Sequence, residues 1–307
     1  MKTILLTGAN GMVGKNVLSH ANAKSLKWLT PGRKELNLTD QFAVESFIKK
    51  HQPDFIIHAA GLVGGIQANI SVPVDFLVNN MRIGMNVLHG AMLAGIPNVL
   101  NLGSSCMYPR NATNPLKEEM VLAGELEPTN EGYAIAKVAA ARLCQYISQQ
   151  SPDLAYKTAI PCNLYGSYDH FEAHRSHMIP AVIDKLHKAK KSQIQQVDIW
   201  GDGLSRREFM YAQDLADFVF YAMNNFSAMP NMLNVGLGKD VLINDYYKVI
   251  AEAVGYKGGF THDLSKPSGM RQKLVDTSKL QDFGWYAPTS LKQGIEKTYI
   301  YYLELQA

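Results

Sequence analysis

The chain has 307 residues and a formal net charge of +3, with 47% apolar and 19% charged residues. This composition is typical of a globular rather than a disordered protein, and the length is enough to bury a large core. The small charge is spread along the chain without a basic tail or Lys/Arg block, so we expect no nucleic-acid partner.

The apolar runs are short. The first ends after about five residues, and no later run reaches the roughly 18 residues of a membrane span, so we expect neither a leader peptide nor membrane attachment. Three cysteines, Cys106, Cys144 and Cys162, form no CxxC pair and no plausible disulfide framework. A reducing cytoplasm is the expected compartment, and it would keep Cys106 as a thiol.

Strand and helix patterns alternate through the first half of the chain. Apolar runs predict strands at residues 2–8, 26–32, 53–61, 98–105 and 156–166. Helical periodicity and caps predict helices at residues 11–22, 39–52, 73–95 and 133–150. Strands separated by helices indicate a doubly wound parallel α/β sheet, the Rossmann arrangement.

The periodicity weakens after Gly166. A helix at 179–190, a strand at 232–238 and a helix at 243–255 remain recognisable among loops. We therefore predict a dinucleotide-binding domain at 1–163, rejoined by part of 211–240, and a smaller α/β substrate-binding domain at 164–307.

Three glycines, Gly8, Gly11 and Gly14, form GxxGxxG between the first predicted strand and helix. Such a turn lets the backbone approach a pyrophosphate at a helix N-terminus. A purely structural strand-to-helix turn is the alternative. The flanking strand-helix-strand pattern favours the dinucleotide site.

The end of the second predicted strand indicates which dinucleotide binds. An NAD enzyme usually has an acidic residue there, for the ribose 2′-hydroxyl. This chain instead has Arg33 and Lys34, with no carboxylate before Glu35. A guanidinium pairs well with a 2′-phosphate, so NADP(H) is predicted; a solvated basic turn is the alternative.

Tyr133 and Lys137 are spaced i and i+4, so they share one helix face. A nearby ammonium favours the ionised form of a tyrosine hydroxyl, although such pairs are often structural. The pair follows the glycine turn and the polar strand end that holds Ser104 and Cys106. That order favours a catalytic interpretation.

The order of these features resembles the extended branch of the short-chain dehydrogenase/reductase superfamily over essentially the whole chain. Six motifs narrow the resemblance to the GDP-L-fucose synthase family: GSSCMYP, LEPTNEGYAIAK, NLYG, SHMIPA, WGDGLSRREF and FGWY. The resemblance implies an NADPH-dependent 3,5-epimerase and 4-reductase of a GDP-4-keto-6-deoxy sugar. It also implies a homodimer formed by helices such as 81–94 and 134–150.

The resemblance also implies residue roles. Ser104 and Tyr133 would bind the 4-keto oxygen, supported by Lys137, and Cys106 and His177 would be the acid/base pair of epimerisation. The cofactor would contact Gly8, Gly11, Met12, Val13, Gly14, Arg33, Ala59, Ala60, Tyr133, Lys137 and Asn163. The GDP-sugar would contact Lys185, Trp200, Arg207 and Lys273, with cations pairing the diphosphate.

The residue types suit this chemistry. A C4 ketone acidifies the hydrogens at C3 and C5, and each inversion needs one group to take a proton and another to return it. A thiol with a pKa of ~8.5 and an imidazole with a pKa of ~6.5 can both change protonation near neutral pH. Ser104 and Tyr133 would stabilise the enolate oxygen as an oxyanion hole does.

Some positions depart from the family pattern. Ala9 and Asn10 occupy the glycine turn where a basic residue is common, Lys185 replaces a common Arg, and His170 a common Asn. The alternatives are therefore a colitose-type 4-keto-3,6-dideoxy sugar or a heptose nucleotide. A reductase without epimerase activity, and a non-catalytic NADP sensor, are disfavoured by the complete set of reactive residues.

His170, His174 and His177 have a spacing that would cluster them on a helix. The glutamate in HFEAH stands at the wrong place for the HExxH zinc motif, and no helix start precedes it. We therefore predict no metal site.

Overall fold

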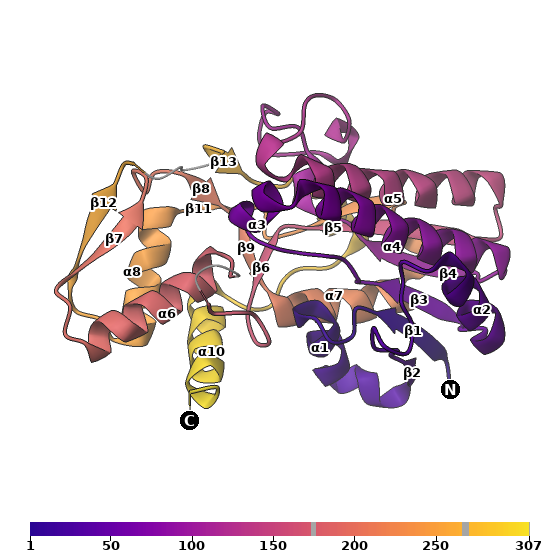
Figure 1. Cartoon of the computed structure of the whole chain (residues 1–307), viewed down its shortest axis with the longest axis horizontal. Coiled ribbons are helices and arrows are strands. Elements are labelled where there is room, and N and C mark those ends of the chain that lie inside the picture. The colour runs from indigo at the N-terminus through magenta and orange to yellow at the C-terminus, as the bar shows by residue number, and fades with distance from the viewer. Residues whose placement is uncertain (173–175, 266–269, 307) are drawn as a thin grey trace.

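The computed structural model describes residues 1–172, 176–265 and 270–306. Within them, six parallel strands form one sheet in the order β10-β5-β4-β3-β1-β2 (Figure 1). The strands are β1 (Thr3–Thr7), β2 (Lys27–Leu29), β3 (Phe55–His58), β4 (Asn98–Leu102), β5 (Ala155–Pro161) and β10 (Met232–Val235). The predicted doubly wound α/β fold is confirmed.

Apolar side chains cover both faces of this sheet, as a parallel sheet requires. Leu5, Ile56 and Val99 are in register and belong to the core on one face. Their neighbours Leu6 and Ile57 belong to the core on the other face. The alternation along each strand places two hydrophobic layers on one sheet.

Helices cover the two faces. On one face α1 (Met12–Ser19) packs against α7 (Ala212–Asn224), and on the other α4 (Pro73–Leu93) lies between α2 (Gln41–His51) and α5 (Glu131–Gln150). Asp40 caps α2, because its carboxylate accepts from the Ala43 N–H at 3.0 Å. No helix in the described part of the chain is both long and apolar enough to cross a membrane.

Smaller sheets form the other part of the molecule, at the left of Figure 1. Their strands are β6 (Asn163–Tyr165), β7 (Gln196–Trp200), β8 (Arg206–Arg207), β9 (Phe209–Tyr211), β11 (Val241–Leu242), β12 (Gly259–Asp263) and β13 (Gln272–Lys273). β12 pairs with β7, β6 with β9, and β8 lies between β11 and β13. Helices α6 (Met178–Lys191), α8 (Ile243–Val254) and α10 (Leu291–Glu304) share one apolar core beside them.

The sequence interpretation was wrong about one strand. Residues 156–166 do not form a single strand, because β5 ends at Pro161 and β6 begins at Asn163 in a different sheet. The N–H of Cys162 donates to the Val235 carbonyl, and the chain then leaves the large sheet. This break carries the chain from the large sheet into the smaller part.

Several short elements and two longer helices were not predicted. The capping box of α10, in which Ser290 and Gln293 bond reciprocally, is a sequence signal that was available. The short elements are α3 (Ile66–Ser71), α9 (Ser278–Phe283), η1 (Ala21–Ser25), η2 (Ser105–Met107), η3 (Glu118–Met120), η4 (Pro128–Asn130) and η5 (Phe226–Ala228). Strand β10 belongs to the large sheet and helix α7 packs in the core on one of its faces, whereas the domain limits themselves remain predictions.

Candidate active site

The carboxyl ends of β1, β3 and β4 meet at one edge of the sheet, with Thr7, His58 and Asn101 in register. The glycine turn follows β1, Ala59 and Ala60 follow β3, and Ser104 follows β4. Ligands of doubly wound folds bind outside such carboxyl ends. The predicted cofactor and ketone sites therefore lie at the same edge.

Close packing fixes the glycine turn. Gly8 has a φ of +76°, and a Cβ there would lie 2.8 Å from the Ala59 carbonyl and the Ala60 Cα. A Cβ on Gly14 would lie 2.3 Å from the Gly8 oxygen. Neither position tolerates a side chain, which explains both glycines.

Gly11 is the N-cap of α1 and offers no side-chain cap, so the first N–H groups of the helix have no side-chain acceptor. Met12 and Val13 begin that helix. Exposed N–H groups and the positive end of a helix dipole suit a pyrophosphate. The turn therefore fits a dinucleotide.

A carboxylate lies in the turn after β2. Glu35 Oε2 accepts from the Gly32 N–H at 2.7 Å, and an added Cβ on Gly32 would lie 3.7 Å from Asn10 Nδ2. Arg33 and Lys34 are exposed beside it. The sequence interpretation placed Arg33 in this turn and missed the structural part played by Glu35.

His58 ends β3 and contacts Thr7 at the predicted cofactor edge. Its Nδ1 lies 2.8 Å from the Thr7 hydroxyl, which accepts from the Ala60 N–H at 3.4 Å. Burial, assisted by the charge of Lys137, lowers the His58 pKa to about 3. The imidazole is therefore neutral and structural at neutral pH.

Tyr133 and Lys137 lie on α5 with Ser104 beside them. Lys137 Nζ donates to the Leu102 carbonyl at 2.9 Å and lies 5.8 Å from the centre of the Tyr133 ring. Burial lowers the Lys137 pKa to about 8, and the nearby Cys106 opposes this. Burial also raises the pKa of Tyr133, although a hydrogen bond with the Ser104 side chain acts to lower it. Tyr133 therefore keeps its proton at neutral pH, as a proton donor must.

Cys106 lies within η2, next to this set. Its side chain is 6% exposed and packs against Leu126 and Ala134. Its N–H donates to the Ser104 hydroxyl at 3.4 Å. Burial raises the thiol pKa, whereas the charges of Lys273 and Lys137 and the Ser104 hydrogen bond lower it. The thiol thus lies among the groups expected to hold the ketone.

His177 lies at the start of α6, and Lys273 lies on β13. His177 is the N-cap residue of α6, and its pKa is lowered by burial and then by the charge of Lys273. The pKa of Lys273 is itself lowered by burial, while Cys106 opposes that shift. Lys273 is therefore electrostatically coupled to both members of the predicted acid/base pair. The sequence interpretation assigned Lys273 to the nucleotide and did not predict this coupling.

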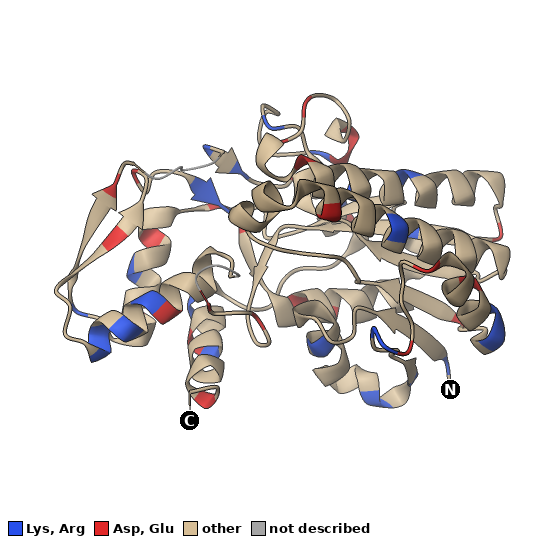
Figure 2. Ribbon diagram, in the orientation of Figure 1, with Lys and Arg blue, Asp and Glu red and all other residues tan. Residues whose placement is uncertain are grey.

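Two cations lie side by side on neighbouring strands. Lys273 of β13 is in register with Arg207 of β8, and the basic residues of these strands lie together in Figure 2. Burial lowers the pKa of Arg207, and Arg207 contributes to the lowered pKa of Lys273. Paired, partly buried cations suit a diphosphate.

The other predicted nucleotide contacts are on or next to β7. Lys185 Nζ bonds Asp198 Oδ1 at 2.8 Å and the Asp198 carbonyl at 2.6 Å. Trp200 ends the same strand with 56% of its surface exposed. An acidic partner for Lys185 was not expected from the sequence.

Asn163 and Glu208 connect segments that are distant in the sequence through hydrogen bonds. Asn163 Nδ2 donates to the Glu208 carbonyl at 3.2 Å. The Glu208 carboxylate accepts from the N–H groups of Leu237, Gly238 and Val275, and burial raises its pKa to about 7. Glu208 was missed because a buried glutamate inside a basic motif has no distinguishing pattern.

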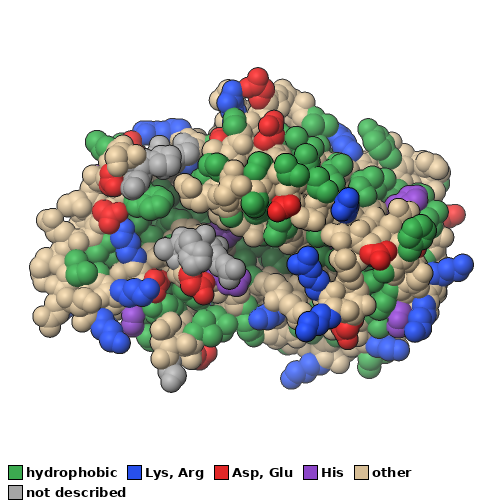
Figure 3. Space-filling model, viewed as in Figure 1, with side chains coloured by type: hydrophobic (Ala, Val, Ile, Leu, Met, Phe, Trp, Pro, Cys, Tyr) green, Lys and Arg blue, Asp and Glu red, His purple; other side chains and the backbone are tan. Residues whose placement is uncertain are grey.

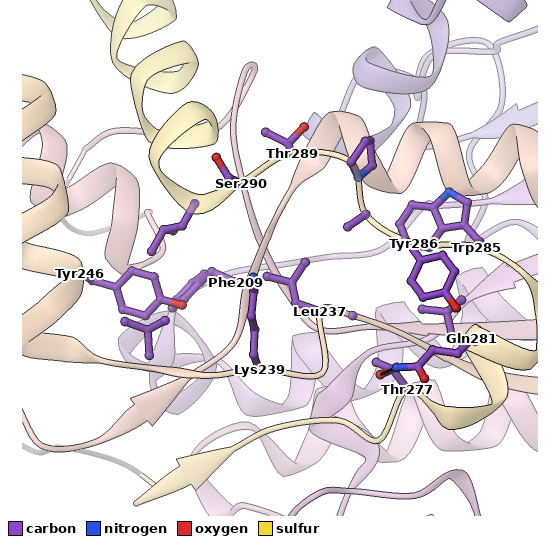
Figure 4. Close-up of a pocket in the computed structure, with 16 residues that line it drawn as sticks. Phe209, Leu237, Lys239, Tyr246, Thr277, Gln281, Trp285, Tyr286, Thr289 and Ser290 are labelled. Atoms are coloured by element: carbon purple, nitrogen blue, oxygen red, sulfur yellow. Dashed lines mark hydrogen bonds between the residues drawn. The ribbon is translucent and has the colours of Figure 1, made fainter.

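The histidine spacing weighed above falls partly on His174, which lies outside the described residues. Among residues 1–172, 176–265 and 270–306, no three His, Cys, Asp or Glu side chains are grouped for a metal. A cavity of about 310 Å³ is lined by Leu237, Thr277, Trp285 and Thr289 among others, and none of the predicted site residues lines it (Figure 4). We assign it no role.

A dinucleotide turn, with a hydroxyl and lysine set at the same sheet edge, defines a nucleotide-cofactor-dependent enzyme. The chain belongs to the NAD dependent epimerase/dehydratase family, whose sequence profile matches residues 4–236. It is 56% identical over 300 residues to a GDP-L-colitose synthase of Yersinia pseudotuberculosis, covering 98% of this chain and 97% of that one.

A GDP-L-fucose synthase of Azorhizobium caulinodans is 44% identical over 302 residues, with 98% and 96% of the two chains covered. A solved structure of a GDP-mannoheptose C4 reductase from Campylobacter jejuni with NADP bound has a TM-score of 0.90 at 30% identity, with 98% of each chain covered. The predicted family and the prediction of an enzyme are confirmed.

Proposed function

We propose that the protein is an NADPH-dependent epimerase/reductase of a GDP-4-keto-6-deoxy-hexose. The product would be GDP-L-fucose or its 3-deoxy relative, GDP-L-colitose. The observation that carries this proposal is that Cys106 packs against Tyr133 of α5 and donates its N–H to the Ser104 hydroxyl at 3.4 Å. An acid/base thiol thus lies beside the groups suited to bind a ketone.

In the epimerisation half, Ser104 and Tyr133 donate hydrogen bonds to the C4 carbonyl oxygen and stabilise the enolate that forms when a neighbouring carbon loses its proton. His177 has a lowered pKa and Cys106 a raised one, so the resting site offers a neutral imidazole and a protonated thiol. One accepts a proton and the other returns one to the opposite face.

In the reduction half, Tyr133 gives its proton to the C4 oxygen, and the ammonium of Lys137 stabilises the tyrosinate that this leaves. The bound cofactor supplies hydride to C4. The glycine turn and α1 would hold its pyrophosphate, and Arg33 would contact its 2′-phosphate. NADP bound in a similar solved structure supports this choice of cofactor.

For the nucleotide, Arg207 and Lys273 pair with the diphosphate, and the exposed Trp200 contacts the GDP. Lys185 is held by Asp198, so it reaches the ligand only together with that carboxylate. The higher identity to a GDP-L-colitose synthase than to a GDP-L-fucose synthase favours the 3-deoxy sugar. With two hydrogens at C3, that sugar requires inversion at C5 alone.

The test is an assay of NADPH oxidation with GDP-4-keto-6-deoxy-mannose and with its 3-deoxy analogue, followed by NMR of each product. We expect turnover of both, with a higher kcat/KM for the 3-deoxy sugar. Oxidation of NADPH without inversion at C5 would leave only a reductase, the chemistry named for the Campylobacter neighbour. No turnover with either sugar would refute the proposal.

We further propose a cytoplasmic homodimer formed by α4 and α5. Exposed apolar side chains lie at helical spacings on these helices: Val74, Val78 and Met85 on α4, and Ile135 and Tyr146 on α5. Hydrophobic side chains gather over the same two helices in Figure 3. Light scattering after gel filtration should give twice the mass of the chain. Met85→Glu should shift it to the monomer, whereas the exposed Phe42→Glu on α2 should not.

A further inference from the structure

Tyr108 is the next-to-last residue of the GSSCMYP segment and has no part in the proton transfers described above. Its side chain is 2% exposed, and its hydroxyl donates to Asn234 Oδ1 at 2.5 Å. Asn234 is fully buried in β10 of the large sheet. Because η2 ends at Met107, this hydrogen bond anchors the residue that directly follows the helical turn carrying Cys106.

Asn234 joins this anchor to two other segments. Its Nδ2 donates to the Leu116 carbonyl at 2.8 Å and to the Asp276 carbonyl at 3.0 Å. Its own N–H donates to Glu118 Oε1 at 2.9 Å. We call Tyr108, Leu116, Glu118, Asn234 and Asp276 the Asn234 network.

The network also fixes the strand that carries Lys273. Leu116 forms a β-bridge with Val275, and its N–H donates to the Leu274 carbonyl at 2.8 Å. Asn114, which we include in the network because it holds the same strand, accepts through its Oδ1 from the Leu274 N–H at 2.8 Å. In the sequence, Cys106 lies two residues before Tyr108, and Lys273 lies three residues before Asp276.

We propose that the Asn234 network is a positioning device that holds the Cys106 side chain and the Lys273 ammonium opposite one another, so that Cys106 can serve in epimerisation. The proposal rests on the proposed function. A buried asparagine with both of its polar ends bonded is stiff, because moving it leaves several buried groups without partners. Loss of the Tyr108 hydroxyl therefore loosens the η2 end of the network.

Besides the groups of its own segment, the thiol is electrostatically coupled to groups on two other elements. These are Lys273 on β13, and Lys137 and Tyr133 on α5, of which Tyr133 also packs against it. Among the charges that favour the thiolate, Lys273 has the largest effect. Separation of Lys273 from the thiol therefore raises the Cys106 pKa, whereas Lys137 and Tyr133 stay on their helix.

The first experiment compares Tyr108→Phe with Tyr156→Phe. Tyr156 is a matched control: it is also fully buried and donates one hydrogen bond, to the Ile96 carbonyl at 3.1 Å, within the core of the large sheet. Iodoacetamide labelling of the Cys106 peptide, followed by mass spectrometry across pH, gives the midpoint of thiolate formation. We expect the midpoint to rise by about 0.5 unit or more in Tyr108→Phe and to stay unchanged in Tyr156→Phe.

Activity gives an independent measurement. Solvent-deuterium wash-in at C5 of the keto sugar should fall several-fold in Tyr108→Phe. Oxidation of the reduced GDP-sugar by NADP⁺, which needs Tyr133 and Lys137 but not Cys106, should match that of Tyr156→Phe. A midpoint and a wash-in rate equal to those of the control would overturn the proposal.

If Tyr108→Phe does not fold, Asn114→Ala decides the question. Asn114 is only half-buried, and its loss frees the strand of Lys273 at Leu274. The same upward shift would support the network, and an unchanged midpoint would overturn it. Failure of the proposed function gives a different result: the wild-type protein would show no wash-in with either sugar. The labelling midpoints of wild type and variants could still be compared in that case.

Discussion

Tyr133→Phe removes the group that should protonate the C4 oxygen while leaving Ser104 as the second hydrogen-bond donor. The raised pKa of Tyr133 means that the wild-type hydroxyl is protonated at neutral pH and available as an acid. The variant lacks that proton altogether. It also loses the ammonium-supported tyrosinate that Lys137 would stabilise on the same helix face.

The expected magnitude follows from these two losses. General acid catalysis contributes about 10²–10⁴-fold, which corresponds to about 3–5 kcal/mol in the barrier of reduction. Deuterium wash-in depends on the hydroxyl only as a hydrogen-bond donor to the enolate, and Ser104 remains. Reduction should therefore fall about 100-fold more than wash-in does.

The assay follows NADPH oxidation and deuterium incorporation in the same reaction at neutral pH, with Tyr156→Phe as the buried-tyrosine control. Thermal melts of both variants check that they are folded, since one lost hydrogen bond costs about 1 kcal/mol. If Tyr133→Phe reduced the C4 ketone within about tenfold of the control, Tyr133 would not be the proton donor and the assigned mechanism would fail.

Three further predictions follow from the same site. Cys106→Ser, which changes volume little, should lower wash-in and formation of the inverted product by about 100-fold or more, while slow reduction of the uninverted sugar survives; normal wash-in would remove Cys106 from the acid/base pair. Arg33→Asp should lower the NADPH/NADH ratio of kcat/KM by about 10–100-fold, and equal use of both cofactors by wild type would contradict the role of Arg33. Lys137 has a pKa of about 8 against an ordinary value of 10.5, so reduction should decline as pH rises through about 8. The folded state favours neutral Lys137 because its pKa is lowered there. The unfolding free energy of wild type should therefore rise by about 3 kcal/mol relative to that of Lys137→Met between about pH 8 and 10.5. Parallel curves of unfolding free energy against pH would argue against the lowered pKa.

Local patterns predicted the parts of the site that are local in the chain. Tyr133 and Lys137 share a helix turn, and the glycines of the first turn lie within seven residues of one another, so both could be recognised from spacing. The continuous apolar runs of β1 and β3 likewise predicted strands of the large sheet. In each case, the sequence neighbours are also the spatial neighbours.

The remaining features depend on contacts between distant segments. The coupling of Lys273 to Cys106 arises because β13 pairs with β8 and Leu116 bridges to Val275. The partner of Lys185 is on the next strand, and nothing in the spacing of Lys185 and Asp198 distinguishes an ion pair from two solvated charges. Family resemblance supplied the identity of Lys273 as a site residue but not its place beside the thiol.

These contacts divide the chemistry unequally between the two parts of the molecule. Ser104, Tyr133 and Lys137 lie at the edge of the large sheet, where β4 and α5 hold them, so the groups proposed to act in reduction all come from that part. The acid/base pair instead combines Cys106, which follows β4, with His177, which precedes α6 in the smaller part. The proposed proton transfers therefore depend directly on how the two parts are placed, whereas the groups proposed to act in reduction keep their positions relative to one another. Any substitution that lets the parts shift should reduce inversion before it reduces ketone reduction, because an error of about 1 Å in a proton-transfer geometry costs about 100-fold in rate.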